Sequence, residues 1–220
     1  MTKTLIYLAD LPHTGQLVAS NTHPYGVGLI ASYLIHKLPE KVEVELFKYP
    51  DDLSAALDKR VPAIIGFANY SWNCNLAYEY ARRIKKNYPK TVIVFGGPNY
   101  GLSLEEQLEF WRRYPLMDFY VLKEGEAAMV ELVQVLEKYG NDAAALKAAG
   151  ELVPSCHYME KGVFTAGPLL PRMKDLGEVP SPYQAGLMDK FFDNILIPMT
   201  CTTRGCPFQC TFCTEGTSYY

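Results

Sequence analysis

The chain has 220 residues, of which 49% are hydrophobic and 20% are charged, a composition typical of a globular protein. Its 21 basic and 24 acidic residues give a net charge of −3, which offers no basic surface for nucleic acid. The N-terminal apolar run is too short for a signal peptide, and no other segment reaches membrane-spanning length. We therefore expect a cytoplasmic protein with neither a membrane nor a nucleic-acid partner.

The first 140 residues alternate short apolar runs with amphipathic segments. The apolar runs predict strands at 3–9, 42–47, 63–68, 91–97 and 117–122. The intervening segments predict helices at 23–38, from 51 onward, and at 74–88, 104–113 and 126–139. Ser103 and Glu106 are spaced as a capping box at the start of the fourth helix.

Strands that alternate with helices in this way imply right-handed crossovers and a parallel sheet covered on both faces. We predict an α/β domain over residues 1–140 with a five-stranded parallel, Rossmann-like (flavodoxin-like) sheet. Ligands on such sheets bind beyond the carboxyl ends of the strands.

The pattern changes after residue 140. A small alanine-rich helix is predicted at 142–149, and residues 152–167 predict a β-hairpin that turns at 160–162. Residues 168–186 are rich in proline and glycine and predict an extended linker. We assign 141–193 to this connecting region and expect a new domain over 194–220, opening with a strand at 195–200.

Four of the six cysteines lie within the last twenty residues. In a reducing compartment such crowding indicates a metal or redox site rather than a disulfide framework. Cys206, Cys210 and Cys213 are spaced C-x3-C-x2-C, and three thiolates on a four-iron cluster leave one iron open for a substrate or cofactor. A zinc site completed by Cys201 is the alternative.

The segment RGCPFQCTFC, preceded by a proline-rich linker and a predicted strand, resembles the cluster loop of the radical S-adenosylmethionine (SAM) superfamily. The resemblance implies that Cys206, Cys210 and Cys213 hold a [4Fe-4S] cluster and that SAM chelates the open iron. It implies that Phe212 packs against the adenine of SAM. It further implies a 5′-deoxyadenosyl radical that abstracts hydrogen, with electrons from a reducing donor such as a flavodoxin or ferredoxin.

The catalytic domain of that superfamily is a TIM-type barrel of βα units, and the chain holds only its first predicted strand and the cluster loop. We therefore expect the chain to be the N-terminal portion of a longer enzyme, with a truncated barrel and no activity by itself.

The order of the segments resembles one branch of the superfamily, whose members carry an N-terminal cobalamin (B12)-binding domain. The matching stretches are HPYGVGLIASYL after the first strand, VIVFGGPN at the fourth, DFYVLKEGEAAMVEL at the fifth and VPSPY in the linker. This resemblance implies methyl transfer to an unactivated carbon of a small-molecule substrate, with methylcobalamin as the methyl donor. Ring-forming and oxidative variants exist in the same branch.

The predicted cobalamin contacts follow the carboxyl ends of the strands. Gly96 and Gly97 leave room for the backbone to approach a flat ligand, and Trp72 could cover a face of the corrin. Glu126 is also favoured at its position by the helix dipole. The full predicted set is Asp10, Leu11, Pro12, Ser71, Trp72, Gly96, Gly97, Pro98, Gly125 and Glu126.

The first loop, ADLPHTG, agrees with the D-x-H-x-x-G motif of many cobalamin proteins only at Asp10 and Gly15. Pro12 stands where the motif places the lower cobalt ligand, and His13 follows one residue late. That shift moves an imidazole further than a metal–nitrogen bond of about 2 Å can absorb. We therefore expect base-off cobalamin with no histidine below the metal. Two alternatives stay open: an α/β domain that no longer binds cobalamin, and a non-enzymatic corrinoid or zinc module.

Overall fold

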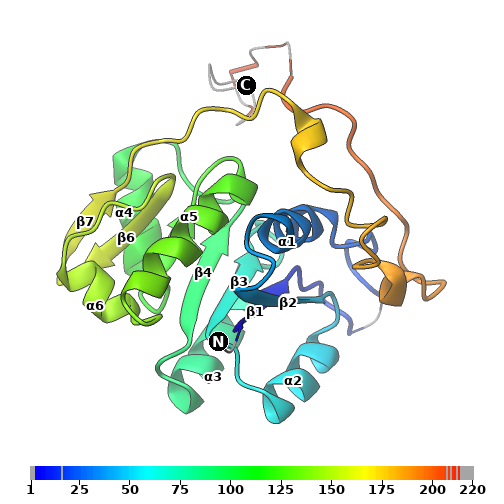
Figure 1. Cartoon of the computed structure of the whole chain (residues 1–220), viewed down its shortest axis with the longest axis horizontal. Coiled ribbons are helices and arrows are strands. Elements are labelled where there is room, and N and C mark those ends of the chain that lie inside the picture. The colour runs from blue at the N-terminus through cyan, green and yellow to red at the C-terminus, as the bar shows by residue number, and fades with distance from the viewer. Residues whose placement is uncertain (1–2, 16, 207, 209, 212, 214–220) are drawn as a thin grey trace.

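The computed structural model describes residues 3–15, 17–206, 208, 210–211 and 213. Within this part of the chain the strands form one sheet with the order β2-β1-β3-β4-β5-β6-β7. Helices cover both of its faces (Figure 1).

Five parallel strands make up most of the sheet, as predicted. They are β1 (Thr4–Ala9), β2 (Val42–Phe47), β3 (Ile64–Ala68), β4 (Val92–Gly96) and β5 (Phe119–Val121). β1 pairs with β2 and β3, and β4 pairs with β3 and β5. The order 2-1-3-4-5 is that of flavodoxin-like folds, which bind ligands where the strand order reverses, beside β1 and β3. The predicted fold class is confirmed.

The helices between the strands begin and end within a few residues of the predicted positions. They are α1 (Tyr25–Lys37), α2 (Pro50–Lys59), α3 (Cys74–Asn87), α4 (Leu104–Arg113) and α5 (Gly125–Lys138). The capping box of Ser103 and Glu106 is formed as expected. α1 and α5 pack against each other on one face of the sheet (Figure 1). In the part of the chain that is described, no helix has the length and apolarity needed to cross a membrane.

The predicted hairpin is present and extends the main sheet. After α6 (Ala143–Ala148), strands β6 (Cys156–Glu160) and β7 (Val163–Ala166) are joined by Lys161 and Gly162, whose φ angles of 48° and 82° suit a tight hairpin turn. β6 runs antiparallel to β5. The hairpin therefore covers an edge that would otherwise expose unpaired backbone groups of β5.

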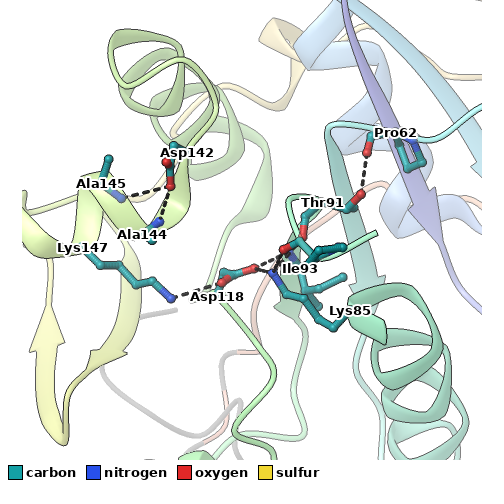
Figure 2. Close-up of polar contacts among 10 residues, drawn as sticks. Pro62, Lys85, Thr91, Ile93, Asp118, Asp142, Ala144, Ala145 and Lys147 are labelled. Carbon is teal, nitrogen blue, oxygen red and sulfur yellow. Dashed lines mark hydrogen bonds and ion pairs between the residues drawn. The ribbon is translucent and has the colours of Figure 1, made fainter. Parts of the chain in front are cut away.

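Asp118 joins three elements at the amino-terminal edge of the sheet (Figure 2). It accepts a hydrogen bond from the backbone nitrogen of Ile93 at 2.8 Å. It also forms ion pairs with Lys85 of α3 at 2.6 Å and Lys147 of α6 at 3.1 Å. Because Asp118 is buried, two cations and one backbone donor compensate for the lost hydration of its charge.

The proline- and glycine-rich segment after β7 has little regular structure, as predicted. Between residues 168 and 193, all of them described, it forms two short 3-10 turns, η1 (Leu176–Glu178) and η2 (Asp189–Phe191). The segment nevertheless packs closely: Met188 and Phe191 are buried, and the Ser32 hydroxyl of α1 donates to the Pro180 carbonyl at 2.7 Å. In Figure 1 it crosses the top of the view to reach α1 before the chain returns toward its C-terminal end.

The strand expected at 195–200 is not formed. This segment makes a single isolated bridge, between Thr22 and Ile197. A strand needs partners for its backbone groups, and no described strand flanks these residues. Ile195, Ile197 and Met199 of this segment are 53%, 56% and 43% exposed.

Candidate cofactor site

A cavity of about 600 Å³ opens at the carboxyl edge of the sheet. Its floor is largely apolar and is formed by the ends of β1, β3, β4 and β5, while the start of α1 forms one wall. The floor residues are Leu8, Phe67, Ala68, Val94, Phe95 and Val121. This is the place at which parallel α/β sheets bind ligands.

Glycines from several elements line the cavity. They are Gly26, Gly66, Gly96, Gly97, Gly125 and Gly205, of which Gly26, Gly97 and Gly205 are exposed. Gly97 has a φ of 134°, and a Cβ there would lie 2.6 Å from the carbonyl oxygen of Asn69, so this turn requires glycine. A Cβ on Gly26 would meet nothing within 4 Å, so the space beside α1 is open. An apolar floor rimmed by accessible backbone fits a broad, flat ring such as a corrin.

Asp10 is the acidic group that lines the cavity at the end of β1. Its Oδ2 atom lies 2.9 Å from Nζ of Lys48, which is buried, and its Oδ1 atom lies 3.5 Å from Nδ2 of Asn73. A buried ammonium needs a close counter-charge, and Asp10 provides it. The carboxylate is thereby held in place at the cavity wall.

Tyr70, rather than Trp72, is the aromatic side chain of the loop after β3 that lines the cavity. Trp72 is half exposed and stacks on Tyr70, with ring centroids 4.5 Å apart and an interplanar angle of 8°. Burial raises the pKa of Tyr70, so this residue stays a neutral phenol near pH 7. Trp72 was predicted because of its larger ring, but Tyr70 follows the end of β3 more closely.

The other predicted contacts divide into two groups. Asp10, Gly96, Gly97, Gly125 and Glu126 line the cavity together. Leu11 and Pro12 are buried, and Ser71 and Pro98 are exposed; like Trp72, these four are outside the cavity lining. His13 is also outside the lining, and its Nε2 atom lies 3.0 Å from the carbonyl oxygen of Trp72.

The cysteine-bearing segment forms part of the wall of the same cavity. The lining residues from this segment are Met199, Cys201, Thr203, Arg204, Gly205 and Cys206. Cys210 and Cys213 are exposed, and the backbone nitrogen of Cys213 donates to the Cys210 carbonyl at 3.1 Å. Phe212 lies outside the described residues. Cys74 and Cys156 are buried, as expected for small core residues.

Three thiols are the soft donor set that iron–sulfur clusters use. Among the described side chains, however, no three His, Cys, Asp or Glu residues gather so as to hold a metal ion. The chemistry of the donors therefore fits a cluster, while their described positions do not form a ready centre for a single ion.

Arg204 attaches this segment to the start of α5. Its Nη1 atom lies 3.2 Å from Oε2 of Glu126 and 3.5 Å from Oε1 of Glu124, and its Nη2 atom donates to Oε1 of Glu126. No motif in the sequence predicted a structural role for Arg204. Its position two residues before Cys206 gives no sign of a partner 78 residues away.

Comparison with known proteins identifies the class. The B12 binding domain family model matches residues 15–133, which is more than half of the chain, so the protein belongs to that family. The cobalamin-dependent radical SAM methyltransferase TokK of Streptomyces tokunonensis is 28% identical over 71% of this chain and 22% of TokK. The 2-(S-pantetheinyl)-carbapenam-3-carboxylate methyltransferase of Streptantibioticus cattleyicolor is 30% identical over 71% of this chain and 22% of its own length.

Two further relatives agree. An uncharacterized methyltransferase of Pyrococcus horikoshii is 27% identical over 99% of this chain and 47% of its own length. The structure of the cobalamin-dependent radical SAM enzyme OxsB, with aqua-cobalamin and SAM bound, superposes with a TM-score of 0.70 and 23% identity over 96% of this chain and 28% of OxsB. These matches confirm the resemblance to the cobalamin-binding-domain branch of the radical SAM family. The chain spans less than half the length of these relatives.

Proposed function

We propose that the chain binds cobalamin in the cavity at the carboxyl edge of its sheet and acts within a cobalamin-dependent radical SAM enzyme that transfers a methyl group to an unactivated carbon. One observation carries this proposal. Three predicted corrinoid contacts, Gly96, Gly97 and Gly125, line the same cavity as the predicted cluster ligand Cys206. A ligand on the sheet edge would therefore lie beside the cysteine-bearing segment, and the names of the relatives support methyl transfer.

In this proposal the chain's residues bind and orient. The apolar floor receives the ring, bare backbone at the glycines allows close approach, and Asp10, held by Lys48, presents a fixed polar group. Cys206, Cys210 and Cys213 would hold the [4Fe-4S] cluster. When bound, the cluster with SAM supplies one-electron chemistry and cobalamin supplies the methyl group. A small-molecule substrate and a donor such as a flavodoxin or ferredoxin are the proposed partners.

The proposed state of the cofactor is base-off with no histidine below cobalt. Among the described residues that line the cavity, none is a histidine. His13 instead contacts the carbonyl of Trp72. These placements support the prediction that His13, one residue beyond the position of the motif histidine, does not bind cobalt.

Cobalamin binding can be tested with a substitution that fills the cavity. Gly26→Phe places a ring where a Cβ meets open space, and it leaves the packed core untouched. We expect the chain to bind hydroxocobalamin and methylcobalamin with base-off absorbance spectra, and Gly26→Phe to raise the Kd at least about tenfold because it occupies the ligand's volume. An anaerobic absorbance titration measures both.

His36→Phe is the matched control, since it places the same phenyl ring at an exposed position at the other end of α1. Equal affinity in Gly26→Phe and the unmodified chain would place the ligand elsewhere. No binding by the unmodified chain would favour an α/β domain that has lost cobalamin.

The cluster assignment is tested separately by iron and sulfide analysis after anaerobic reconstitution. Combined Cys206→Ala, Cys210→Ala and Cys213→Ala substitution should abolish iron loading, because the thiolate ligands are removed. Full iron content in that variant would contradict the assignment. One zinc and no sulfide in the unmodified chain would favour the zinc module.

A further inference from the structure

Glu124 and Glu126 flank Gly125 at the start of α5, and all three residues line the cavity. Their side chains are only 8% and 5% exposed, and Arg204, itself 19% exposed, is the basic residue paired with both. Carboxylates removed from water to this degree require a counter-charge. The first turn of α5 compensates part of the charge of Glu126, and the guanidinium of Arg204 supplies a full positive charge to the pair.

Glu124 and Arg204 also contact the segment that follows β7. The backbone nitrogen of Met173 donates to Oε2 of Glu124 at 2.6 Å, and Arg172 donates to the carbonyl oxygen of Arg204. Three parts of the chain that are distant in sequence therefore meet at one edge of the cavity: the start of α5, the segment after β7 and the cysteine-bearing segment.

The geometry of Arg204 is specific for arginine. Two nitrogens of its guanidinium contact the two oxygens of Glu126, a planar, bidentate arrangement that lysine cannot reproduce. This contact anchors the side chain of Arg204, and the bond from Arg172 to the Arg204 carbonyl restrains its backbone. Gly205 and Cys206 follow at once and line the cavity.

We propose that Arg204 is a positioning residue: its pairing with Glu124 and Glu126 holds residues 199–206 against the open side of the cavity, so that a bound corrinoid and the cysteine-bearing segment order each other. This inference rests on the proposed cobalamin site. Such coupling is reciprocal. If the ordered segment makes corrinoid binding more favourable, then the bound corrinoid stabilises the ordered segment by the same free energy.

The test combines binding with hydrogen exchange on the whole chain. We expect hydroxocobalamin to slow amide exchange over 201–206. Arg204→Ala should remove most of that protection and weaken hydroxocobalamin binding at least about fivefold, the lower end of typical coupling between sites. Arg204→Lys should lose less protection and less affinity than Arg204→Ala, because lysine keeps the positive charge but cannot make the planar, bidentate contact. If Arg204→Ala fails to fold, Arg204→Lys and Glu126→Gln carry the test.

Two comparisons distinguish a positioning role of Arg204 from a direct contact between Glu126 and the corrinoid and from a general effect of removing an arginine. Glu126→Gln should cost little additional affinity in an Arg204→Ala background, whereas a direct contact between Glu126 and the corrinoid would make the two effects additive. Arg82→Ala, which breaks an exposed pair with Glu79 on α3, should leave both readouts unchanged.

Unchanged affinity and unchanged protection in Arg204→Ala, with binding intact in the unmodified chain, would overturn the inference and leave the proposed function standing. Absence of hydroxocobalamin binding by the unmodified chain would overturn both.

Discussion

His157 on β6 is a buried imidazole that contacts the hydroxyl of Tyr100. The indole nitrogen of Trp111 can only donate, and it lies 2.9 Å from the Tyr100 hydroxyl. The same hydroxyl lies 3.2 Å from Nδ1 of His157, and which of the two donates depends on the tautomer of the imidazole. Burial lowers the pKa of His157 to about 4, so the ring is neutral at pH 7.

This pKa predicts a pH dependence of stability. A histidine in the unfolded chain titrates near about 6.5, so between that pH and about 4 the unfolded state binds a proton that the folded state does not. The free energy of unfolding should therefore fall as the pH is lowered through this window. Urea denaturation at pH 7 and pH 4.5 should show a smaller difference for His157→Phe than for the unmodified protein.

His36→Phe, at an exposed site, should retain the full pH difference. Equal pH dependence in His157→Phe and the unmodified protein would show that His157 is protonated equally in both states.

At the scale of the elements, Asp118 connects β5 with α3 and α6 at the sheet edge opposite the cavity (Figure 2). Asp118→Asn keeps a hydrogen-bonding side chain and leaves Lys85 and Lys147, both mostly buried, without their counter-charge. We expect a loss of about 3 kcal/mol in the free energy of unfolding, as for other buried pairs that lose one partner. Urea denaturation at pH 7 measures it.

The exposed pair of Glu79 and Arg82 is the matched control, and Glu79→Gln should change stability by less than about 1 kcal/mol. A loss as small as this in Asp118→Asn would mean that solvent reaches the Asp118 site and screens the charges.

At the scale of the whole molecule, the segment after β7 is part of the packed structure. Met188 is fully buried against α1, where a Cβ on Gly28 would collide with its terminal methyl group. Met188→Ala should lower the free energy of unfolding by about 3 kcal/mol through the lost contacts and the cavity it leaves. The unfolding curve should keep a single transition.

Leu169→Ala, at an exposed position of the same segment, should change stability by less than about 0.5 kcal/mol. An equally small effect of Met188→Ala would show that the segment is docked too weakly to contribute to the core.

The sequence by itself determined the five parallel strands, the helices between them and the hairpin turn. Each of these depends on a periodicity or a turn signal contained within about ten residues, so local spacing suffices to predict it. It also identified five of the cavity-lining residues, Asp10, Gly96, Gly97, Gly125 and Glu126, because the carboxyl ends of parallel strands meet at one edge.

Only the tertiary structure decided which segments became neighbours. It attached the hairpin to β5, placed Tyr70 rather than Trp72 at the cavity, limited 195–200 to one isolated bridge, and joined Arg204 to Glu126. Periodicity reports that a residue will be buried or paired, but it does not name the partner. The packing of the whole chain determines which residue 78 positions away becomes the partner. Once the fold has brought them together, the buried carboxylate of Glu126 and the guanidinium of Arg204 form a bidentate ion pair.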